Sequence, residues 1–245
     1  MTKLQSFSPN TSGRDFICSD IHGHFSLLET SLAKLNFDVT KDRLFCLGDL
    51  IDRGYESHLV IDYLAKPWFF SILGNHEMML IDAYESDNSD VARQWYFWGG
   101  DWAEDFSNET LAHYYESLVK LPMAIEIELT SGDESANPKI GLVHAELPME
   151  CSWDEVREEL VARGERQNST GSRLTHSMLW NRGQVSGGYY SGLVQEVRDI
   201  DHVFHGHTIV NRVTTIANRT FLDLGSYKTG QLGIINPREF LSEYG

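Results

Sequence analysis

The sequence predicts an α/β fold, in which short buried strands alternate with amphipathic helices and carry polar residues at their carboxyl ends. Five apolar runs of strand length each lead directly into polar sequence. These runs begin at Asp15, Arg43, Trp68, Lys139 and Asp201. Between the first three runs, residues 25–35 and 57–66 place apolar side chains at helical spacing. This β-α-β-α-β order is typical of a parallel sheet covered by helices.

The middle of the chain has mainly helical character. Residues 77–120 are expected to be largely helical, with an interruption at Gly99–Gly100. Residues 152–163 predict a surface helix that is capped by the serine at its start and carries acidic residues in its first turn.

Strands and turns are expected in the rest of the chain. The alternation in residues 123–129 predicts a strand with one solvated face, and residues 131–138 have the composition of a turn. Residues 212–237 are expected to form three strands. No change in composition marks a boundary, so we expect one domain over residues 1–245.

Charge and cysteine content exclude several classes of protein. With 36 Asp and Glu against 20 Lys and Arg, the net charge is −16, which excludes a protein held to nucleic acid mainly through phosphate contacts. No stretch approaches the roughly 18 apolar residues of a membrane span, so no membrane partner is expected. The first residues lack a signal-peptide core, and three cysteines without CxxC spacing favour a reducing cytoplasm.

Side chains able to bind metals lie where the predicted strands end, which is where α/β sheets form active sites. They are Asp20, His22, Asp49, Asn75, His144 and His207. This mixture of oxygen and nitrogen donors suits Mn²⁺, Fe²⁺ or Zn²⁺, and the absence of cysteine argues against a closed structural zinc site. Each motif alone has an ordinary explanation, such as a capped loop or a core histidine, but five in this order are hard to obtain by chance.

Taken together, the motifs resemble those of the phosphoprotein phosphatase (PPP) family of calcineurin-like metallophosphatases. The matching segments are Asp-x-His-Gly at 20–23, Gly-Asp-x-x-Asp-Arg-Gly at 48–54, Gly-Asn-His-Glu at 74–77, His-Ala at 144–145 and Gly-His-Thr at 206–208. Gly-Gly-Asp-Trp at 99–102 and Leu-Pro at 121–122 place the resemblance closest to the bacterial and bacteriophage-lambda type of serine/threonine phosphatase. The resemblance implies a central β-sandwich flanked by helices, with a dinuclear metal site at the strand carboxyl ends.

The resemblance also implies two divalent metal ions, with Mn²⁺ expected first and Fe²⁺ or Zn²⁺ as alternatives. The implied ligands are Asp20 and His22 for one metal, Asp49 as the bridge, and Asn75, His144 and His207 for the second metal. A carboxylate suits the bridging position because its two oxygens can serve two cations. His205 is a second ligand candidate in the last motif. We favour His207, because it stands in the family's Gly-His-Thr pattern, and this leaves His205 as an inward strand residue or as a partner of a ligand.

The family pattern further implies residues for catalysis and substrate binding. His76 with Asp52 matches the acid pair that assists the leaving group, because an adjacent carboxylate can hold a histidine cationic. Arg53 matches an arginine that grips the phosphoryl group, and Arg182 matches a second one on a shorter motif. Asn75 is expected to contact substrate as well as metal.

These roles predict a metal-dependent phosphomonoesterase that acts on phosphoserine and phosphothreonine in proteins, with phosphotyrosine as an extension, by direct attack of a hydroxide that bridges the metals. A symmetrical diadenosine tetraphosphatase-like nucleotide hydrolase is the first alternative. A degenerate scaffold that only binds phosphoproteins is the second, and the intact ligand set argues against it. The aromatic cluster in residues 95–102 suits either a helix packed on the sheet or an aromatic wall beside the metals. The sequence does not indicate an oligomeric state.

Overall fold

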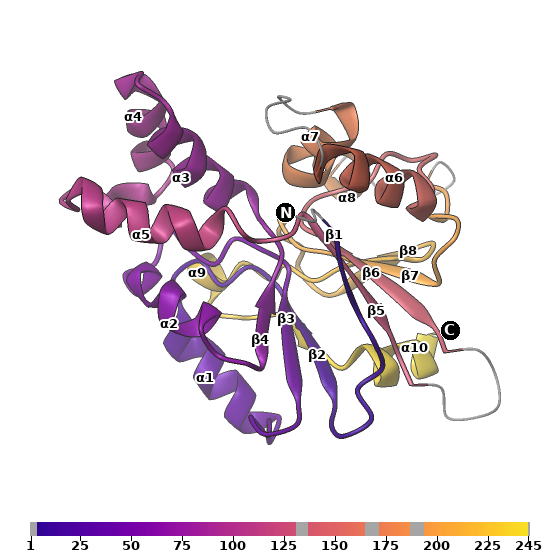
Figure 1. Ribbon diagram of the computed structural model, residues 1–245. Helices are drawn as coiled ribbons and strands as arrows, with labels where there is room; N and C mark the ends of the chain where they lie inside the picture. The colour runs from indigo at the N-terminus through magenta and orange to yellow at the C-terminus, as the bar shows by residue number, and fades with distance from the viewer. Residues whose placement is uncertain (1–3, 131–136, 165–171, 187–193, 245) are drawn as a thin grey trace.

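Two β-sheets pack face to face, with helices on their outer faces (Figure 1). The computed structural model describes residues 4–130, 137–164, 172–186 and 194–244. Most of the turn expected over residues 131–138 therefore lies outside the described residues. The sandwich with flanking helices agrees with the architecture that the family resemblance implied.

The four-stranded sheet contains the parallel strands expected near the start of the chain. In spatial order its strands are β10 (Ile234–Ile235), β2 (Asp15–Cys18), β3 (Arg43–Cys46) and β4 (Phe69–Ser71). The connections contain α1 (Phe25–Lys34), then the 3₁₀ turn η1 (Ser57–Leu59) with α2 (Val60–Leu64). The β-α-β-α-β prediction is thus confirmed. Only β10 runs antiparallel to its neighbour among these strands.

The second sheet has six strands and mixed direction. In spatial order they are β1 (Leu4–Phe7), β5 (Ala124–Glu128), β6 (Lys139–Val143), β7 (His202–His205), β9 (Arg219–Phe221) and β8 (Thr214–Ile216). Strands β8, β9 and β10 correspond to the three strands expected over 212–237. Strand β1 was not predicted, because its four residues, Leu-Gln-Ser-Phe, form no apolar run. It is defined by its parallel pairing with β5.

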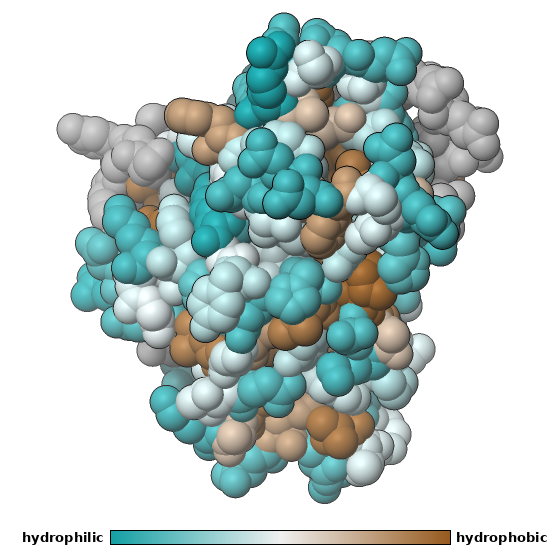
Figure 2. Space-filling view, turned by 90° about the vertical axis from the view of Figure 1, so that its left-hand side faces the viewer, coloured by the Kyte–Doolittle hydropathy of each residue, from teal (hydrophilic) through white to brown (hydrophobic). Residues whose placement is uncertain are grey.

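The helices agree with the sequence-based expectations for the middle of the chain. Residues 75–118 form α3 (Asn75–Glu85), α4 (Ser89–Phe97), the 3₁₀ turn η2 (Gly100–Ala103) and α5 (Asn108–Leu118). The break at Gly99–Gly100 is confirmed. Figure 2 shows the side of the molecule on which these helices lie, where hydrophilic residues predominate and hydrophobic ones are interspersed.

The remaining helices are α6 (Trp153–Gly164), α7 (Arg173–Trp180), α8 (Gly183–Ser186), α9 (Ser226–Thr229) and α10 (Pro237–Tyr244). Ser152 caps α6 as expected: its hydroxyl accepts the backbone N–H of Glu155, whose carboxylate accepts the backbone N–H of Ser152. Among the described residues, no helix combines the length and the apolar character needed to cross a bilayer.

The two sheets share an apolar core because alternate residues of each strand point to opposite faces. Ile17 and Phe45 pack between the sheets, whereas their neighbours Phe16 and Leu44 pack beneath the helices. The six-stranded sheet contributes Ile125, Ile127, Ile140, Leu142, Phe204 and Leu222 to the same inner layer. Strands that are buried on both faces explain the continuous apolar runs in the sequence.

The expectation of a solvated face on residues 123–129 is confirmed only in part, because Glu126 and Glu128 are half-buried. Helix α6 covers that face, and Trp153, which is fully buried, donates its indole N–H to Glu126 at 2.7 Å. Arg157 of the same helix forms an ion pair with Glu126 at 2.7 Å. The glutamate therefore fits the alternating pattern of a solvated strand, although it is half-buried and anchors a helix.

Replacing Gly141 of β6 by alanine should destabilise the protein. A Cβ atom there would lie 2.4 Å from the ring of Trp153, which is enclosed on all sides. We expect the free energy of unfolding in urea to fall by about 1–3 kcal/mol, as for other overpacked cores. Gly183→Ala is the matched control, because its Cβ would meet nothing nearer than 3.7 Å. Equal stability of the two variants would contradict the packing described here.

Candidate metal centre

The loops at the carboxyl ends of five strands, drawn from both sheets, meet at one buried site. Asp20 and His22 follow β2, Asp49 follows β3, Asn75 and His76 follow β4, His144 follows β6, and His207 follows β7. Each of these side chains belongs to a residue that is at most 4% exposed. The structure thus brings together all the strand-end residues that the sequence singled out.

Asp49 lies at the centre of this site, between two groups of possible ligands. One group is His22, Asp49 and His76, and the other is Asp49, His144 and His207; within each group the ligand atoms lie within 4.8 Å of one another. Asp49 Oδ2 is 3.6 Å from His22 Nε2, and Asp49 Oδ1 is 3.4 Å from His144 Nε2. The two oxygens of one carboxylate therefore face two different imidazoles.

Two histidines of the site turn Nε2 toward Asp49 because backbone carbonyls hold their other ring nitrogen. His144 Nδ1 lies 2.7 Å from the Leu47 carbonyl, and His22 Nδ1 lies 3.1 Å from the Ile51 carbonyl. A carbonyl only accepts, so each Nδ1 carries the proton and each Nε2 keeps its lone pair. Burial lowers the pKa of both histidines, which favours this neutral, ligating form.

The donor set fits divalent cations. Nε2 of His207 is buried and has no hydrogen-bond partner among the described residues, and burial lowers the pKa of His207 to about 2. Next to it lie three buried carboxylates, of Asp20, Asp49 and Asp223, and burial together with their mutual repulsion raises the pKa of Asp20. Divalent ions would satisfy the orphaned nitrogen and neutralise the crowded acids.

Asp20 and Asp223 have positions that the sequence analysis did not predict. The Asp20 carboxylate lies outside both compact groups and accepts the backbone N–H of His207 at 2.9 Å, so it fixes the loop after β7. Asp223 was not singled out from the sequence. Burial, with the charge of Asp49, raises the pKa of Asp223 to about 6. The one feature of the sequence that could have identified Asp223 is its position just after β9, at another strand end.

Glu77 is the main residue of the site to which sequence reasoning gave no role, although it ends the Gly-Asn-His-Glu motif. Its buried carboxylate accepts the backbone N–H groups of Asp49 and Gly74 at 2.9 Å and of Leu50 at 2.8 Å. It therefore joins the loop after β3 to the loop after β4. Burial, followed by the charge of Asp49, raises the pKa of Glu77 to about 7.

Several of these loops adopt a backbone conformation that side chains rarely tolerate. Positive φ angles occur at His22 (46°), Asp49 (48°), Asp52 (72°), Arg53 (69°) and His207 (62°). Such residues are strained, and they persist where the surrounding structure fixes them, most often at functional sites. The positive angles direct these side chains into the site at a conformational cost. Local sequence preferences do not predict such angles at these residues.

His76 and Asp52 form a buried pair at the edge of the site. His76 Nδ1 lies 2.7 Å from Asp52 Oδ2, and the indole N–H groups of Trp95 and Trp102 also donate to this carboxylate. Burial disfavours the charged form of His76, but Asp49 and Asp52 outweigh it and raise the pKa of His76. The Trp residues thus take part in the site, as in the second interpretation of the aromatic cluster.

Both predicted arginines lie beside the ligand loops. Arg53 Nη1 is 2.9 Å from His22 Nε2, and its guanidinium stacks on the ring of Tyr227 at 4.4 Å. Arg182 Nη1 donates to the carbonyl of His207 at 3.0 Å. Tyr227, in α9, was not predicted as part of the site. Two guanidinium groups therefore flank the carboxylate and imidazole cluster.

His205 lies in the core and belongs to neither ligand group. Its ring stacks on Phe221, and its Nδ1 lies 2.5 Å from the carbonyl of Ala145. The ligand group contains His207 instead.

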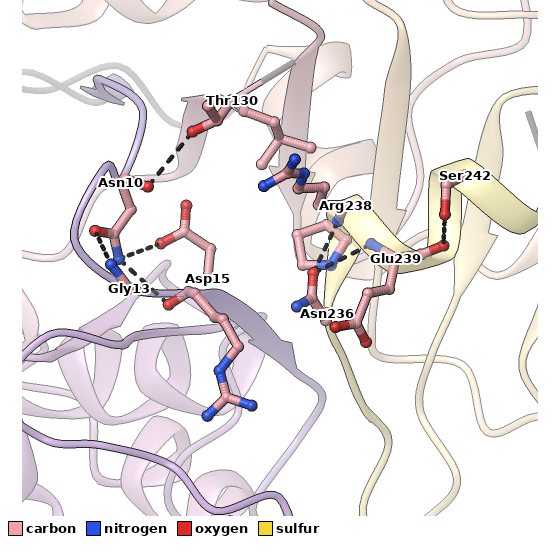
Figure 3. Close-up of a pocket in the computed structure, with 11 residues that line it drawn as sticks. Asn10, Gly13, Asp15, Thr130, Asn236, Arg238, Glu239 and Ser242 are labelled. Atoms are coloured by element: carbon pink, nitrogen blue, oxygen red, sulfur yellow. Dashed lines mark hydrogen bonds between the residues drawn. The ribbon is translucent and has the colours of Figure 1, made fainter. Parts of the chain in front are cut away.

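A separate cavity of about 370 Å³ lies at the opposite ends of the strands, between the start of β2 and α10 (Figure 3). Its lining includes Asn10, Asp15, Thr130 and Arg238, and no residue of the metal centre.

Comparisons with known proteins agree with this arrangement. The model of the family described as calcineurin-like phosphoesterase matches residues 16–211. Serine/threonine-protein phosphatase 2 of Salmonella typhimurium strain LT2 is 34% identical over 89% of both chains. Its Escherichia coli K12 counterpart of the same name is 30% identical over 94% of this chain and 96% of its own.

Two further similarities are more limited. The symmetrical bis(5'-nucleosyl)-tetraphosphatase of Hamiltonella defensa is 43% identical, but over only 27% of this chain and 25% of its own. A solved structure of a serine/threonine phosphatase from Saccharomyces cerevisiae aligns with a TM-score of 0.61 at 18% identity, over 92% of this chain and 72% of that one. The last likeness concerns the fold alone.

Replacing Glu77 by alanine should destabilise the protein by about 2 kcal/mol or more, because several buried backbone N–H groups would lose their acceptor. The measurement is the free energy of unfolding in urea. Glu116→Ala, at an exposed position of α5, is the matched control and should change stability little. If Glu77→Ala were as stable as this control, Glu77 would not be the anchor of the two loops.

Proposed function

Because the chain belongs to the calcineurin-like phosphoesterase family, we propose that it is a metal-dependent phosphomonoesterase that hydrolyses phosphoserine and phosphothreonine in proteins, with phosphotyrosine as a further substrate. The observation that carries this proposal is the Asp49 carboxylate, which is shared by two buried ligand groups beside the His76–Asp52 pair. Similarity to the Salmonella serine/threonine-protein phosphatase 2 along most of both chains supports the choice of substrate.

We propose that six residues hold two divalent ions, Mn²⁺ first, and that Asp49 bridges them. The proposed ligands are Asp20, His22, Asp49, Asn75, His144 and His207. When bound, such a pair of ions supplies Lewis acidity to the phosphate and a water-derived nucleophile near neutral pH. Asn75 Oδ1 lies 2.9 Å from His144 Nε2, a contact that supports its proposed role beside His144 in the second ligand group.

His76 is the proposed proton donor to the leaving group. Asp52 fixes its Nδ1, so its Nε2 faces the site, 4.0 Å from Asp49 Oδ2. The departing alkoxide of serine or threonine is a strong base and requires a proton in the transition state. A histidine whose pKa is raised by neighbouring carboxylates keeps that proton available.

Arg53 and Arg182 are the proposed contacts for the phosphoryl oxygens. Each presents a planar guanidinium, which can bind two oxygens at once, at the edge of the ligand cluster. Arg53 is held by the ring of Tyr227 and Arg182 by the carbonyl of His207, so neither must be recruited from a distance. This preorganisation favours binding of a tetrahedral dianion.

Nucleotide hydrolysis is the competing function. The similarity to symmetrical bis(5'-nucleosyl)-tetraphosphatases covers about a quarter of each chain, whereas the similarity to serine/threonine-protein phosphatases extends over most of it. The difference supports a phosphoprotein substrate. Rates on phosphoserine, phosphothreonine and phosphotyrosine peptides, measured beside diadenosine tetraphosphate, should favour the first two peptides. A higher specificity constant for the dinucleotide would overturn this assignment.

Removal of metal should abolish activity. Exhaustive chelation is expected to reduce hydrolysis of p-nitrophenyl phosphate to background, and added Mn²⁺ should restore it, because the proposed nucleophile is a water-derived hydroxide that the metal ions generate. The measurement is the initial rate beside metal content by mass spectrometry. Full activity after verified metal removal would exclude the two-metal interpretation.

His76→Asn should lower turnover of a phosphoserine peptide by about 10²–10⁴-fold, the usual contribution of a general acid. Metal content should remain largely unchanged, because His76 is proposed as a proton donor. A loss of metal is the alternative outcome, because His76 is one of the three residues in the first compact group of possible ligands. Loss of one equivalent of metal in this variant would identify His76 as a ligand instead.

A further inference from the structure

The segment from Trp95 to Trp102 closes over the carboxylate of Asp52. Trp95 Nε1 donates to Asp52 Oδ2 at 2.9 Å, and Trp102 Nε1 donates to Asp52 Oδ1 at 2.7 Å. Oδ2 also lies 2.7 Å from His76 Nδ1. Both oxygens of a fully buried carboxylate are therefore held by N–H donors, two of them indoles from one short segment.

Two glycines allow the segment to approach this closely. Gly99 has a φ of +114°, and its carbonyl accepts the backbone N–H of Arg53 at 2.9 Å. A Cβ at Gly100 would lie 2.3 Å from the indole of Trp95. The turn thus packs closely against the indole that contacts Asp52. It also fixes the backbone of Arg53, the residue that follows Asp52.

Packing leaves the indoles little freedom to turn away. Trp95 is 1% exposed and meets Trp102 edge to face, with ring centroids 6.4 Å apart. Trp102 is half-buried and packs edge to face against Phe106 and Tyr114. An indole is a donor only, so neither ring can exchange roles with the carboxylate that it holds.

We propose that Trp95 and Trp102 are positioning residues that fix the rotation of the Asp52 carboxylate, and thereby keep His76 aimed at the leaving group. The proposal rests on the proposed function, in which His76 protonates the departing oxygen. Its consequence concerns the class of ester. The serine alkoxide needs that proton, whereas p-nitrophenolate is stable enough to leave without it. The two indoles would therefore determine whether the enzyme can expel the strongly basic leaving group of an alkyl phosphate.

The test compares Trp102→Phe with wild type on a phosphoserine peptide and on p-nitrophenyl phosphate. Phenylalanine removes the N–H and keeps an aromatic ring, although a smaller one, at this position. We expect kcat on the peptide to fall about tenfold or more, the order of a partly lost general acid, with KM and the p-nitrophenyl phosphate rate changed by about twofold or less. Trp98→Phe is the matched control, because Trp98 lies in the same segment and is 50% exposed. Equal losses on both esters, or no loss on either, would overturn the proposal.

Nuclear magnetic resonance provides a readout that does not depend on turnover. Asp52→Asn should shift two of the six tryptophan indole N–H signals. Trp102→Phe should weaken the downfield Nδ1 proton signal of His76, which His76→Asn identifies by its absence. Unchanged indole signals would refute the proposal without bearing on the proposed function, which the wild-type rates on the two esters test separately. A wild-type enzyme that hydrolyses neither ester would instead refute the proposed function. In that case the indole and Nδ1 signals alone would show whether the indoles fix Asp52 beside His76.

Discussion

The ionised carboxylate of Asp49, buried between two sets of imidazoles, is the constraint on which the site depends. Burial opposes its charge, but the cluster of histidines around it holds its pKa well below the usual range. The backbone N–H of His76 donates to Oδ1 at 3.0 Å, and Glu77 holds the backbone of Asp49 itself. A buried charge of this kind is stable only where partners are fixed around it.

This requirement explains why the site lies where the two sheets meet. Strands β2, β3 and β4 of one sheet and β6 and β7 of the other end at the same place, so their loops can surround a single carboxylate. The apolar layer between the sheets, represented by Ile17 and Phe45, fixes the strands relative to one another. A rigid core can sustain positive φ angles at residues such as Asp49 and His207, which an isolated loop would avoid.

The arrangement also separates two tasks. The centre around Asp49 collects negative charge and imidazole donors, which suits cations, whereas Arg53 and Arg182 provide positive charge at its edge. Asp52 is kept apart from the centre by His76 and by the indoles of Trp95 and Trp102. Two aspartates of one short motif therefore serve different roles, because the chain around each is different.

The sequence by itself determined the β-α-β-α-β order near the start of the chain and the identity of most polar residues at the centre, because a strand end in an α/β sheet is a local feature. Asp49, Asn75 and His144 could be located for this reason. The tertiary structure alone decided what covers each element. Helix α6 partly covers Glu126, and the indoles of Trp95 and Trp102 reach Asp52 across 43 and 50 residues of chain. Periodicity shows which face of an element is apolar, but what covers each face depends on contacts between segments far apart in the sequence.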